Sequence, residues 1–476
     1  MIDKEVSKME FVDRVQELAA LEAAYQNPGA ALLVVYGRRR VGKTTLLAQF
    51  CRNKPALYYL ATEESISANR SAFREAAADF LQNELLRSAQ NASWEMIFDA
   101  LFQQARQEKL VIVLDEFQYL GKADKAFPSV FQRIWDTALK NQNVEVILCG
   151  SLIQMMMEQT LSYASPLYGR RTGQIRLGQI PYAHYQQFFP ELTETERILY
   201  YAVTGGVPKY IELFRPCADI YAAIEKNVLL PQSFLYEEPE FLLRREVQEV
   251  GSYFSIIRAV AAGRTRSSQI ASQLSISPTS LSKPLKTLCD LDILEREVPA
   301  TEANPETSKK GQYRIKDNFI AFWFRFVYPM RSFIEGGHPE AALNKLKSGF
   351  IPNHVGYVYE DICRQRLWAL NAKQELPFQF DRVGRWWGGK DTEIDIAAVN
   401  TGDPDKILFG ECKFHLDTPM QVAELNQLRR KAAAVPWGGA NREEYFILFC
   451  AGGYSKELQD LADADSHILL ERLAPQ

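Results

Sequence analysis

The sequence predicts a multidomain chain of the α/β class, and three observations carry this prediction. The chain has 476 residues, which is more than one ordinary hydrophobic core accommodates. In its first part, apolar strand-like runs alternate with stretches of helical spacing, a pattern typical of a parallel sheet covered by helices. The same alternation returns after about residue 336, so we expect a second, smaller α/β domain there.

Changes in these patterns divide the chain into four blocks. Strands and helices alternate over residues 1–180, and strand signals vanish over 181–248, where Leu, Tyr, Glu and Arg recur at helical spacing. Residues 249–335 give three short helical patterns, two strands and a polar loop. We expect an α/β core, a small helical lid, a winged helix and, over 336–476, a C-terminal α/β domain.

The composition argues against several classes of protein. A formal net charge of −4 argues against a protein that coats nucleic acid. The seven cysteines are scattered without a C-x-x-C pair, so we expect reduced thiols and no structural zinc. No run approaches the roughly 18 apolar residues of a membrane span, and Met1 is not followed by a basic and then apolar leader. We therefore expect a cytoplasmic protein with no membrane partner.

The clearest chemical motif lies in the first block, between a strand and a helix. Residues Gly37–Thr44 match G-x-x-x-x-G-K-[ST], after the apolar run 32–36 and before the helical run 45–50. The glycines let backbone N–H groups curl around a β-phosphate, Lys43 reaches the β- and γ-oxygens, and Thr44 can ligate Mg²⁺. This predicts a P-loop for ATP or GTP. The residues expected at the nucleotide are Gly37, Arg38, Arg39, Arg40, Val41, Gly42, Lys43, Thr44 and Thr45.

Polar side chains follow two further strands of the predicted sheet. The run 110–114 ends in Asp115 and Glu116, the pattern of an acid that holds Mg²⁺ and an acid that orients or deprotonates water. The run 144–149, expected between the other two strands, leads to Ser151, whose hydroxyl would sense a γ-phosphate. An ordinary strand-to-turn serine is the alternative for Ser151.

Two arginines, Arg170 and Arg171, stand in a loop that begins at Pro166. Their guanidinium groups would suit the γ-phosphate charge of a neighbouring subunit, which would imply a homo-oligomer. A solvated basic turn explains these arginines equally well.

Together these motifs resemble a known family, the archaeal-type STAND-like P-loop ATPases of the AAA+ superfamily that carry a C-terminal PD-(D/E)xK restriction-endonuclease-like domain. The resemblance spans nearly the whole chain. It rests on five motifs in the family's order, at residues 37–44, 114–118, 149–151, 166–170 and 204–209. The resemblance implies that Pro208 and Lys209 lie in a lid element facing the nucleotide, that Arg170 or Arg171 acts between subunits, and that the nucleotide is ATP.

The third block has helix-turn-helix spacing, with helices expected over 267–274 and 277–288. Residues 251–330 hold eleven Lys and Arg against seven Asp and Glu, so basic charge is concentrated here and a DNA partner is favoured. Pro284 inside the second helix predicts a kink. A packing module or a protein contact remains the alternative. The side chains expected to point outward are Thr279, Ser282, Lys283 and Lys286.

In the C-terminal block, Asp395 is followed by Glu411 and Lys413, the D-x(n)-E-x-K pattern of PD-(D/E)xK nucleases, with Ile394 where that name implies proline. Strand period places Glu411 and Lys413 on one face, beside Asp395 on the adjacent strand. Asp395 and Glu411 would bind Mg²⁺, and Lys413 would orient water. Glu360 matches the helical acid often present in this fold. A binding module with the same fold, or a surface ion pair, remains an alternative.

Basic and aromatic residues precede this pattern and suit either DNA contact or packing. They are Arg382, Arg385, Trp386, Trp387 and Lys390. The full interpretation is an Mg-ATP-hydrolysing P-loop ATPase coupled to a DNA-binding winged helix and a metal-dependent DNA nuclease domain. The alternative is an ATP-switched regulator that binds DNA or protein and whose nuclease-like domain is inactive.

Overall fold

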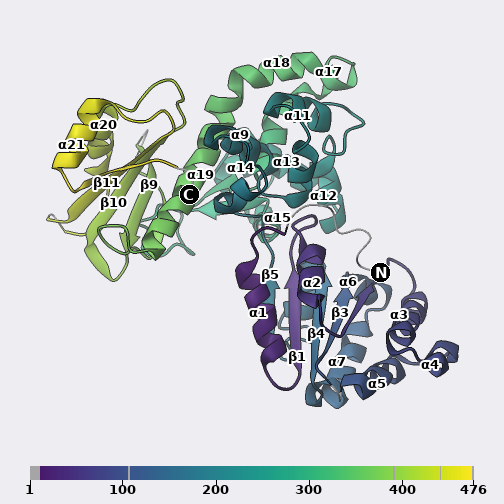
Figure 1. The fold of residues 1–476 in the computed structure, drawn as a ribbon. Coiled ribbons are helices and arrows are strands. Elements are labelled where there is room, and N and C mark those ends of the chain that lie inside the picture. The colour runs from purple at the N-terminus through teal and green to yellow at the C-terminus, as the bar shows by residue number, and fades with distance from the viewer. Residues whose placement is uncertain (1–10, 106–107, 390–391, 440, 474–476) are drawn as a thin grey trace. The chain divides into compact units, whose positions relative to one another are not determined.

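The computed structural model describes residues 11–105, 108–389, 392–439 and 441–473. The chain forms two compact units (Figure 1). Unit 1 comprises residues 1–180 with 207–209, and unit 2 comprises 181–206 with 210–476. The first predicted boundary therefore coincides with a unit boundary, whereas the predicted lid, third block and C-terminal block fall together in unit 2.

Unit 1 is built on a five-stranded parallel sheet of order β2-β3-β4-β1-β5. The three strands predicted from apolar runs are present as β1, β3 and β4, and β4 lies between the other two as expected. These three form because every position in them is buried. The strands are β1 (Ala31–Tyr36), β2 (Ala56–Leu60), β3 (Leu110–Asp115), β4 (Val144–Gly150) and β5 (Gly173–Arg176).

Helices cover both faces of this sheet (Figure 1). On one face, Leu33, Val113 and Ile147 pack with residues of α1 and α2. A second core is aromatic, where Phe98 packs against Phe73 and Phe131 at ring-centroid distances of 5.2 and 6.0 Å. The helices are α1 (Val15–Gln26), α2 (Lys43–Cys51), α3 (Ile66–Leu81), α4 (Glu84–Ser88), α5 (Trp94–Ala105), α6 (Gln118–Ala123), α7 (Phe127–Thr137) and α8 (Ile153–Met156).

Unit 2 begins with helices and continues into the third block, which holds three helices followed by a two-stranded antiparallel hairpin. Ser277 caps the third of these helices by accepting from the N–H of Ser280, and the helix runs on through Pro284, so the expected kink does not end it. The elements are α9 (Glu194–Thr204), α10 (Pro208–Phe214), α11 (Ile220–Val228), α12 (Glu238–Glu246), α13 (Val250–Ala261), α14 (Ser267–Leu274), α15 (Pro278–Asp290), β6 (Leu294–Glu297) and β7 (Gln312–Ile315).

An aromatic helical segment links the hairpin to the C-terminal block. Residues 323–327 and 351–355 are π-helical turns, and Phe326 of the first turn, together with Phe322 at the end of the preceding helix, packs on His354 of the second turn. The helices are α16 (Asn318–Phe322), α17 (Arg331–Glu335), α18 (Pro339–Phe350) and α19 (Gly356–Ala372). Within the described ranges, no helix is long and apolar enough to cross a membrane.

The C-terminal block is a five-stranded mixed sheet of order β12-β11-β10-β9-β8. Strands β8, β9 and β10 pair antiparallel, whereas β10, β11 and β12 pair parallel. Strand β10 is the longest of the five and begins at Asp403, directly after the turn that follows β9. The elements are β8 (Arg382–Trp387), β9 (Glu393–Asn400), β10 (Asp403–Lys413), α20 (Val422–Ala432), β11 (Glu443–Cys450), α21 (Lys456–Ala464) and β12 (Ile468–Glu471).

Candidate nucleotide site and C-terminal carboxylate site

The P-loop turns tightly between β1 and α2, and two of its positions require glycine. A Cβ on Gly37 would lie 2.2 Å from the carbonyl oxygen of Leu177, so no side chain fits there. Gly42 has a φ of 95° at the start of α2, in the left-handed region that favours glycine. Its Cβ position lies 3.8 Å from Pro208 Cγ, so Pro208 lies beside the loop as the resemblance implied.

Lys43 points into the loop. Its Nζ donates to the carbonyl oxygens of Gly37 at 2.7 Å and Arg38 at 2.9 Å, and burial lowers the pKa of its ammonium. Arg14, which the sequence analysis missed, is buried beneath the loop and donates to the carbonyl oxygens of Val41 at 3.0 Å and Gly178 at 2.7 Å. Arg14 therefore links the P-loop to the segment that follows β5 through hydrogen bonds, and no local sequence motif indicates this role.

The expected magnesium ligands converge at the end of β3. Thr44 Oγ1 lies 3.5 Å from Asp115 Oδ2, and the hydroxyl of Tyr58 on β2 donates to that same carboxylate oxygen. Asp115 is buried, whereas Thr44 and its neighbour Thr45 are exposed at the start of α2. A hydroxyl and a carboxylate are hard oxygen donors, so this pair fits Mg²⁺.

Glu116 is held by neutral donors. Its φ is 52°, an uncommon value for a glutamate, and its carboxylate accepts from Ser151 Oγ at 2.8 and 2.9 Å, from the Ser151 N–H at 3.2 Å and from Gln118 Nε2. Arg39 in turn donates to Ser151 Oγ at 3.4 Å and to Tyr119 at 3.3 Å. Ser151 thus contacts the predicted water-activating acid and a P-loop arginine.

Arg170 and Arg171 precede β5 and lie near the amino-terminal end of β1, opposite the end that leads to the P-loop. The next residue, Thr172, is hydrogen-bonded to the backbone of Leu32 near the start of β1. The P-loop begins five residues after Leu32, roughly 16 Å farther along the strand. Arg170 pairs with Asp136 at 3.0 Å, and the guanidinium of Arg171 stacks on Tyr168 at 5.1 Å. Within their own chain these arginines are therefore far from the P-loop.

In unit 2, the structure brings Asp395, Glu411 and Lys413 together on β9 and β10. Lys413 Nζ lies 2.7 Å from Glu411 Oε1, because both side chains leave the same face of β10. Asp395 Oδ2 accepts from the N–H of Cys412 at 2.9 Å. Burial, and then the adjacent Glu411, raises the pKa of Asp395.

Two further residues complete this cluster. Glu360 on α19 is close enough to Asp395 that burial, followed by that carboxylate, raises the pKa of Glu360 to about 8. Lys431 on α20, which the sequence analysis missed, lies 3.2 Å from Glu411 Oε2. Lys431 is eighteen residues beyond Lys413, so no strand or helix period connects the two.

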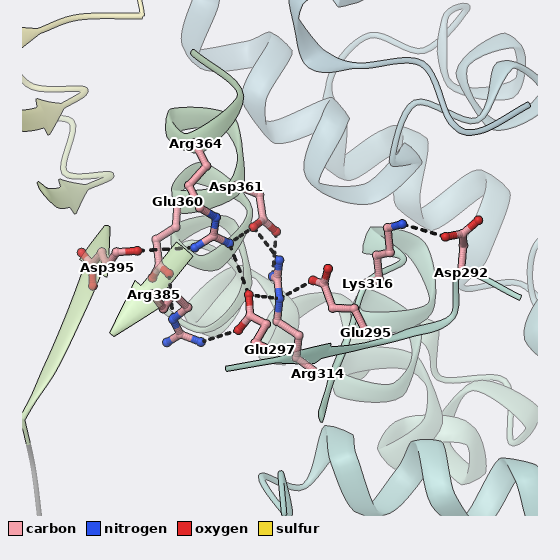
Figure 2. Close-up of polar contacts among 10 residues, drawn as sticks. All are labelled: Asp292, Glu295, Glu297, Arg314, Lys316, Glu360, Asp361, Arg364, Arg385 and Asp395. Atoms are coloured by element: carbon pink, nitrogen blue, oxygen red, sulfur yellow. Dashed lines mark hydrogen bonds and ion pairs between the residues drawn. The ribbon is translucent and has the colours of Figure 1, made fainter. Parts of the chain in front are cut away.

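A network of ion pairs joins the β6–β7 hairpin to this site (Figure 2). Arg314 of the hairpin makes a two-pronged contact with Asp361 of α19 at 2.7 and 2.8 Å, and also contacts Glu297 at 2.9 Å. Arg364 of α19 pairs with Asp361 and donates to the backbone oxygen of Asp395 at 3.4 Å. Although burial opposes it, the two arginines hold the pKa of Asp361 well below its usual range.

Most of the basic and aromatic residues that precede the site, and that were predicted to suit DNA contact or packing, interact with other residues of the chain. Arg385 lies 3.7 Å from both Glu297 and Glu360 and also pairs with Glu393. Trp386 is buried in the core of the sheet, so packing accounts for it, and Trp387 is partly buried. Arg382 donates to backbone oxygens of residues 300 and 302, and Lys390 lies outside the described residues.

The donors of this second site suit a hard cation. Within the described ranges no three His, Cys, Asp or Glu residues are arranged to hold a metal ion. Mg²⁺ is usually bound by one or two carboxylates together with substrate phosphates and water, so Asp395 and Glu411 meet that need. The residues therefore fit such an ion.

Comparison with known proteins agrees with this architecture. Residues 11–214 match the family described as an ATPase domain predominantly from Archaea, and residues 323–427 match a family of archaeal and bacterial proteins of unknown function. Uncharacterized protein MJECL04 of Methanocaldococcus jannaschii is 35% identical over 451 residues, which cover 94% of this chain and 98% of that protein. The Uncharacterized ATP-binding protein MJ0423 of the same organism is 50% identical over 44 residues, 9% of this chain and 75% of that one.

Among solved structures, the Walker-type ATPase PABY2304 of Pyrococcus abyssi is similar to this chain with a TM-score of 0.51 and 22% identity. The match covers 66% of this chain and 96% of that one. It supports the fold of this chain as that of a P-loop ATPase.

Proposed function

We infer the function from two findings: the chain belongs to the family of MJECL04, its relative over nearly the full length, and its residues 11–214 match the ATPase domain predominantly from Archaea. We propose that the P-loop binds Mg-ATP and that the chain hydrolyses it. The observation that carries this proposal is the convergence of Lys43, Thr44 and Asp115 around one loop.

Each side chain then has a distinct task. Lys43 would exchange the carbonyl oxygens of Gly37 and Arg38 for the β- and γ-phosphates, and Thr44 and Asp115 would hold the Mg²⁺. When bound, the ion neutralises charge on the phosphates. Glu116 orients the attacking water, and Ser151 and Gln118 fix its carboxylate. Arg170 and Arg171 are proposed to serve a neighbouring subunit, because within their own chain they lie near the end of β1 opposite the P-loop.

For unit 2 we propose a metal-dependent DNA nuclease that ATP controls. Asp395 and Glu411 would hold Mg²⁺ against a scissile phosphate, and Lys413 would orient water. The third block would bind DNA as a winged helix, since Lys283 and Lys286 are exposed on α15 together with Thr279 and Ser282. The hairpin network places this block and the carboxylate site in one unit.

A second function is favoured by one observation. Both oxygens of Glu411 are already paired with lysines, as in an ordinary buried ion-pair cluster. An ATP-switched regulator, which binds DNA or a partner through α15 and uses the C-terminal domain as a scaffold, would need no metal there.

The test is Mg²⁺-dependent cleavage of supercoiled and linear DNA, with and without ATP, by the full chain and by Lys43→Ala and Asp395→Asn. We expect ATP to stimulate DNA cleavage by the wild type, and Asp395→Asn to abolish this cleavage. We expect ATP turnover to be lost in Lys43→Ala and retained in Asp395→Asn. Cleavage that is equal with and without ATP would contradict the coupling. ATP turnover without cleavage by any form would favour the regulator.

A further inference from the structure

Glu411 is held by two cations from two different elements. Its side chain is only 6% exposed, and its two oxygens are 2.7 Å from Lys413 Nζ and 3.2 Å from Lys431 Nζ. A buried carboxylate needs counter-charge, and here two ammonium groups share that task. Lys413 alone would give Glu411 one ion pair, and Lys431 adds a second. The same cluster also holds Asp395 and Glu360.

The two lysines differ in how they contact Glu411. Lys413 stands two residues from Glu411 on the same strand and lies at the shorter distance, 2.7 Å. Lys431 stands in the last turn of α20, a different element, and lies at 3.2 Å. Both side chains are partly exposed, Lys413 to 34% and Lys431 to 21%. Because Lys431 makes the longer contact, it is the lysine that an incoming cation displaces at the smaller cost.

A divalent cation at Asp395 and Glu411 would make such a move favourable. The incoming ion supplies the positive charge that Lys431 supplied, and the two cations then repel each other at close range. A phosphate of the DNA substrate would bind beside the cation at Asp395 and Glu411, and its negative charge would attract a nearby ammonium group. The displaced ammonium is within reach of that phosphate.

We propose that Lys431 is a second, movable lysine of the C-terminal site. It neutralises Glu411 when the site is empty, and it transfers to a non-bridging phosphate oxygen of the DNA when Asp395 and Glu411 take up a divalent cation. This inference rests on the proposed nuclease function and assigns Lys431 a positioning role in it.

The first measurement is the Mn²⁺ affinity of the full chain without nucleotide, by calorimetric titration, with Asp395→Asn as the background of other sites. Lys431→Ala should bind Mn²⁺ about tenfold more tightly, because a competing cation is removed, and Lys431→Arg should stay close to wild type. Arg430→Ala is the matched control. It removes a cation from the neighbouring, exposed position of α20 and should change the affinity less than twofold.

The second measurement is DNA binding in Ca²⁺ at several salt concentrations. Lys431→Ala should reduce the slope of log affinity against log salt by about 0.9, the loss of one phosphate contact, and should lower the rate of cleavage about tenfold. A purely structural lysine would not tighten metal binding while weakening DNA binding.

The outcomes separate this inference from the function on which it rests. If wild type cuts DNA but Lys431→Ala shows unchanged or weaker Mn²⁺ affinity, or an unchanged salt slope, the role of Lys431 is overturned and the nuclease stands. A wild type that neither binds Mn²⁺ above the Asp395→Asn background nor cuts DNA overturns both.

Discussion

The two units each carry a site built around buried carboxylates, but they balance the charge in opposite ways. In unit 1, Asp115 and Glu116 accept hydrogen bonds from hydroxyl, amide and backbone groups, all of them neutral. In unit 2, Glu411 is paired with two lysines and Glu360 lies beside Arg385. Among the described residues the acids of the first site form no ion pair, although the Lys43 ammonium is close enough to interact with both. A cation that enters the second site, by contrast, must displace one that already contacts Glu411.

The largest expected effect follows from the neutral surroundings of the first site. Asp115→Asn should lower Mg-ATP turnover at least about 100-fold, because it removes a proposed ligand of the ion. It should leave the melting temperature almost unchanged, because the Tyr58 hydroxyl keeps an acceptor. Steady-state turnover and calorimetric melting test both parts, with the exposed Asp99→Asn as control. Turnover within threefold of wild type would contradict the role of Asp115.

The next effect tests the cation-rich surroundings of the second site. Arg314→Met should lower the free energy of unfolding of unit 2 by about 3 kcal/mol, because Glu295 would lose its arginine, and Asp361 and Glu297 would each lose one arginine, in a partly buried network. Lys316→Met, just beyond the same strand, breaks only the half-exposed pair with Asp292 and should cost under about 1 kcal/mol. Urea unfolding measures both variants. Equal losses would mean that the network adds no more stability than an exposed pair.

The smallest expected effect is a difference in pH response between the units. Burial raises the pKa of Glu145 in β4 to about 8, and the structure gives its carboxylate oxygens no hydrogen-bond partner. The folded state thus prefers the protonated acid, so its stabilising contribution is present below about pH 4.5 and is lost as pH rises towards 8. Glu145→Gln should flatten this loss and gain about 2 kcal/mol above pH 8.

His354 in unit 2 should respond in the other direction. Burial lowers the pKa of His354 to about 4, and its Nε2 lies 2.7 Å from the backbone oxygen of Ala202. Its stabilising contribution is present above about pH 6.5 and is lost as pH falls towards 4. Melting curves between pH 4 and 9 measure both contributions. A pH dependence that Glu145→Gln leaves unchanged would contradict the assignment to Glu145.

The sequence predicted the elements that local pattern controls. Continuous apolar runs located β1, β3 and β4 almost to the residue, and the P-loop motif located Lys43. The short edge strand β5 was missed because only one of its four residues is buried. Period two along β10 placed Glu411 and Lys413 together, which the structure confirms.

What the sequence did not predict are contacts between elements far apart in the chain. Arg314 and Asp361 are 47 residues apart, and Lys431 is 20 residues from Glu411. Neither pair has a spacing that any helix or strand repeats, so only the tertiary fold reveals them. For the same reason Arg385 was interpreted as a DNA contact, although its partners Glu297 and Glu360 come from two other elements.

The hairpin network also constrains how this protein can be shortened or recombined during evolution. Suppose that two related genes recombine between the codons for residues 316 and 360. One product keeps the hairpin residues Arg314, Glu295 and Glu297 but takes Asp361 and Arg364 from the other parent, and the second product has the opposite combination. Either product would have buried charges without partners, at a cost of several kcal/mol. The third block and the C-terminal block should therefore be inherited together. Where related chains have exchanged parts, we expect the point of exchange to lie before residue 249.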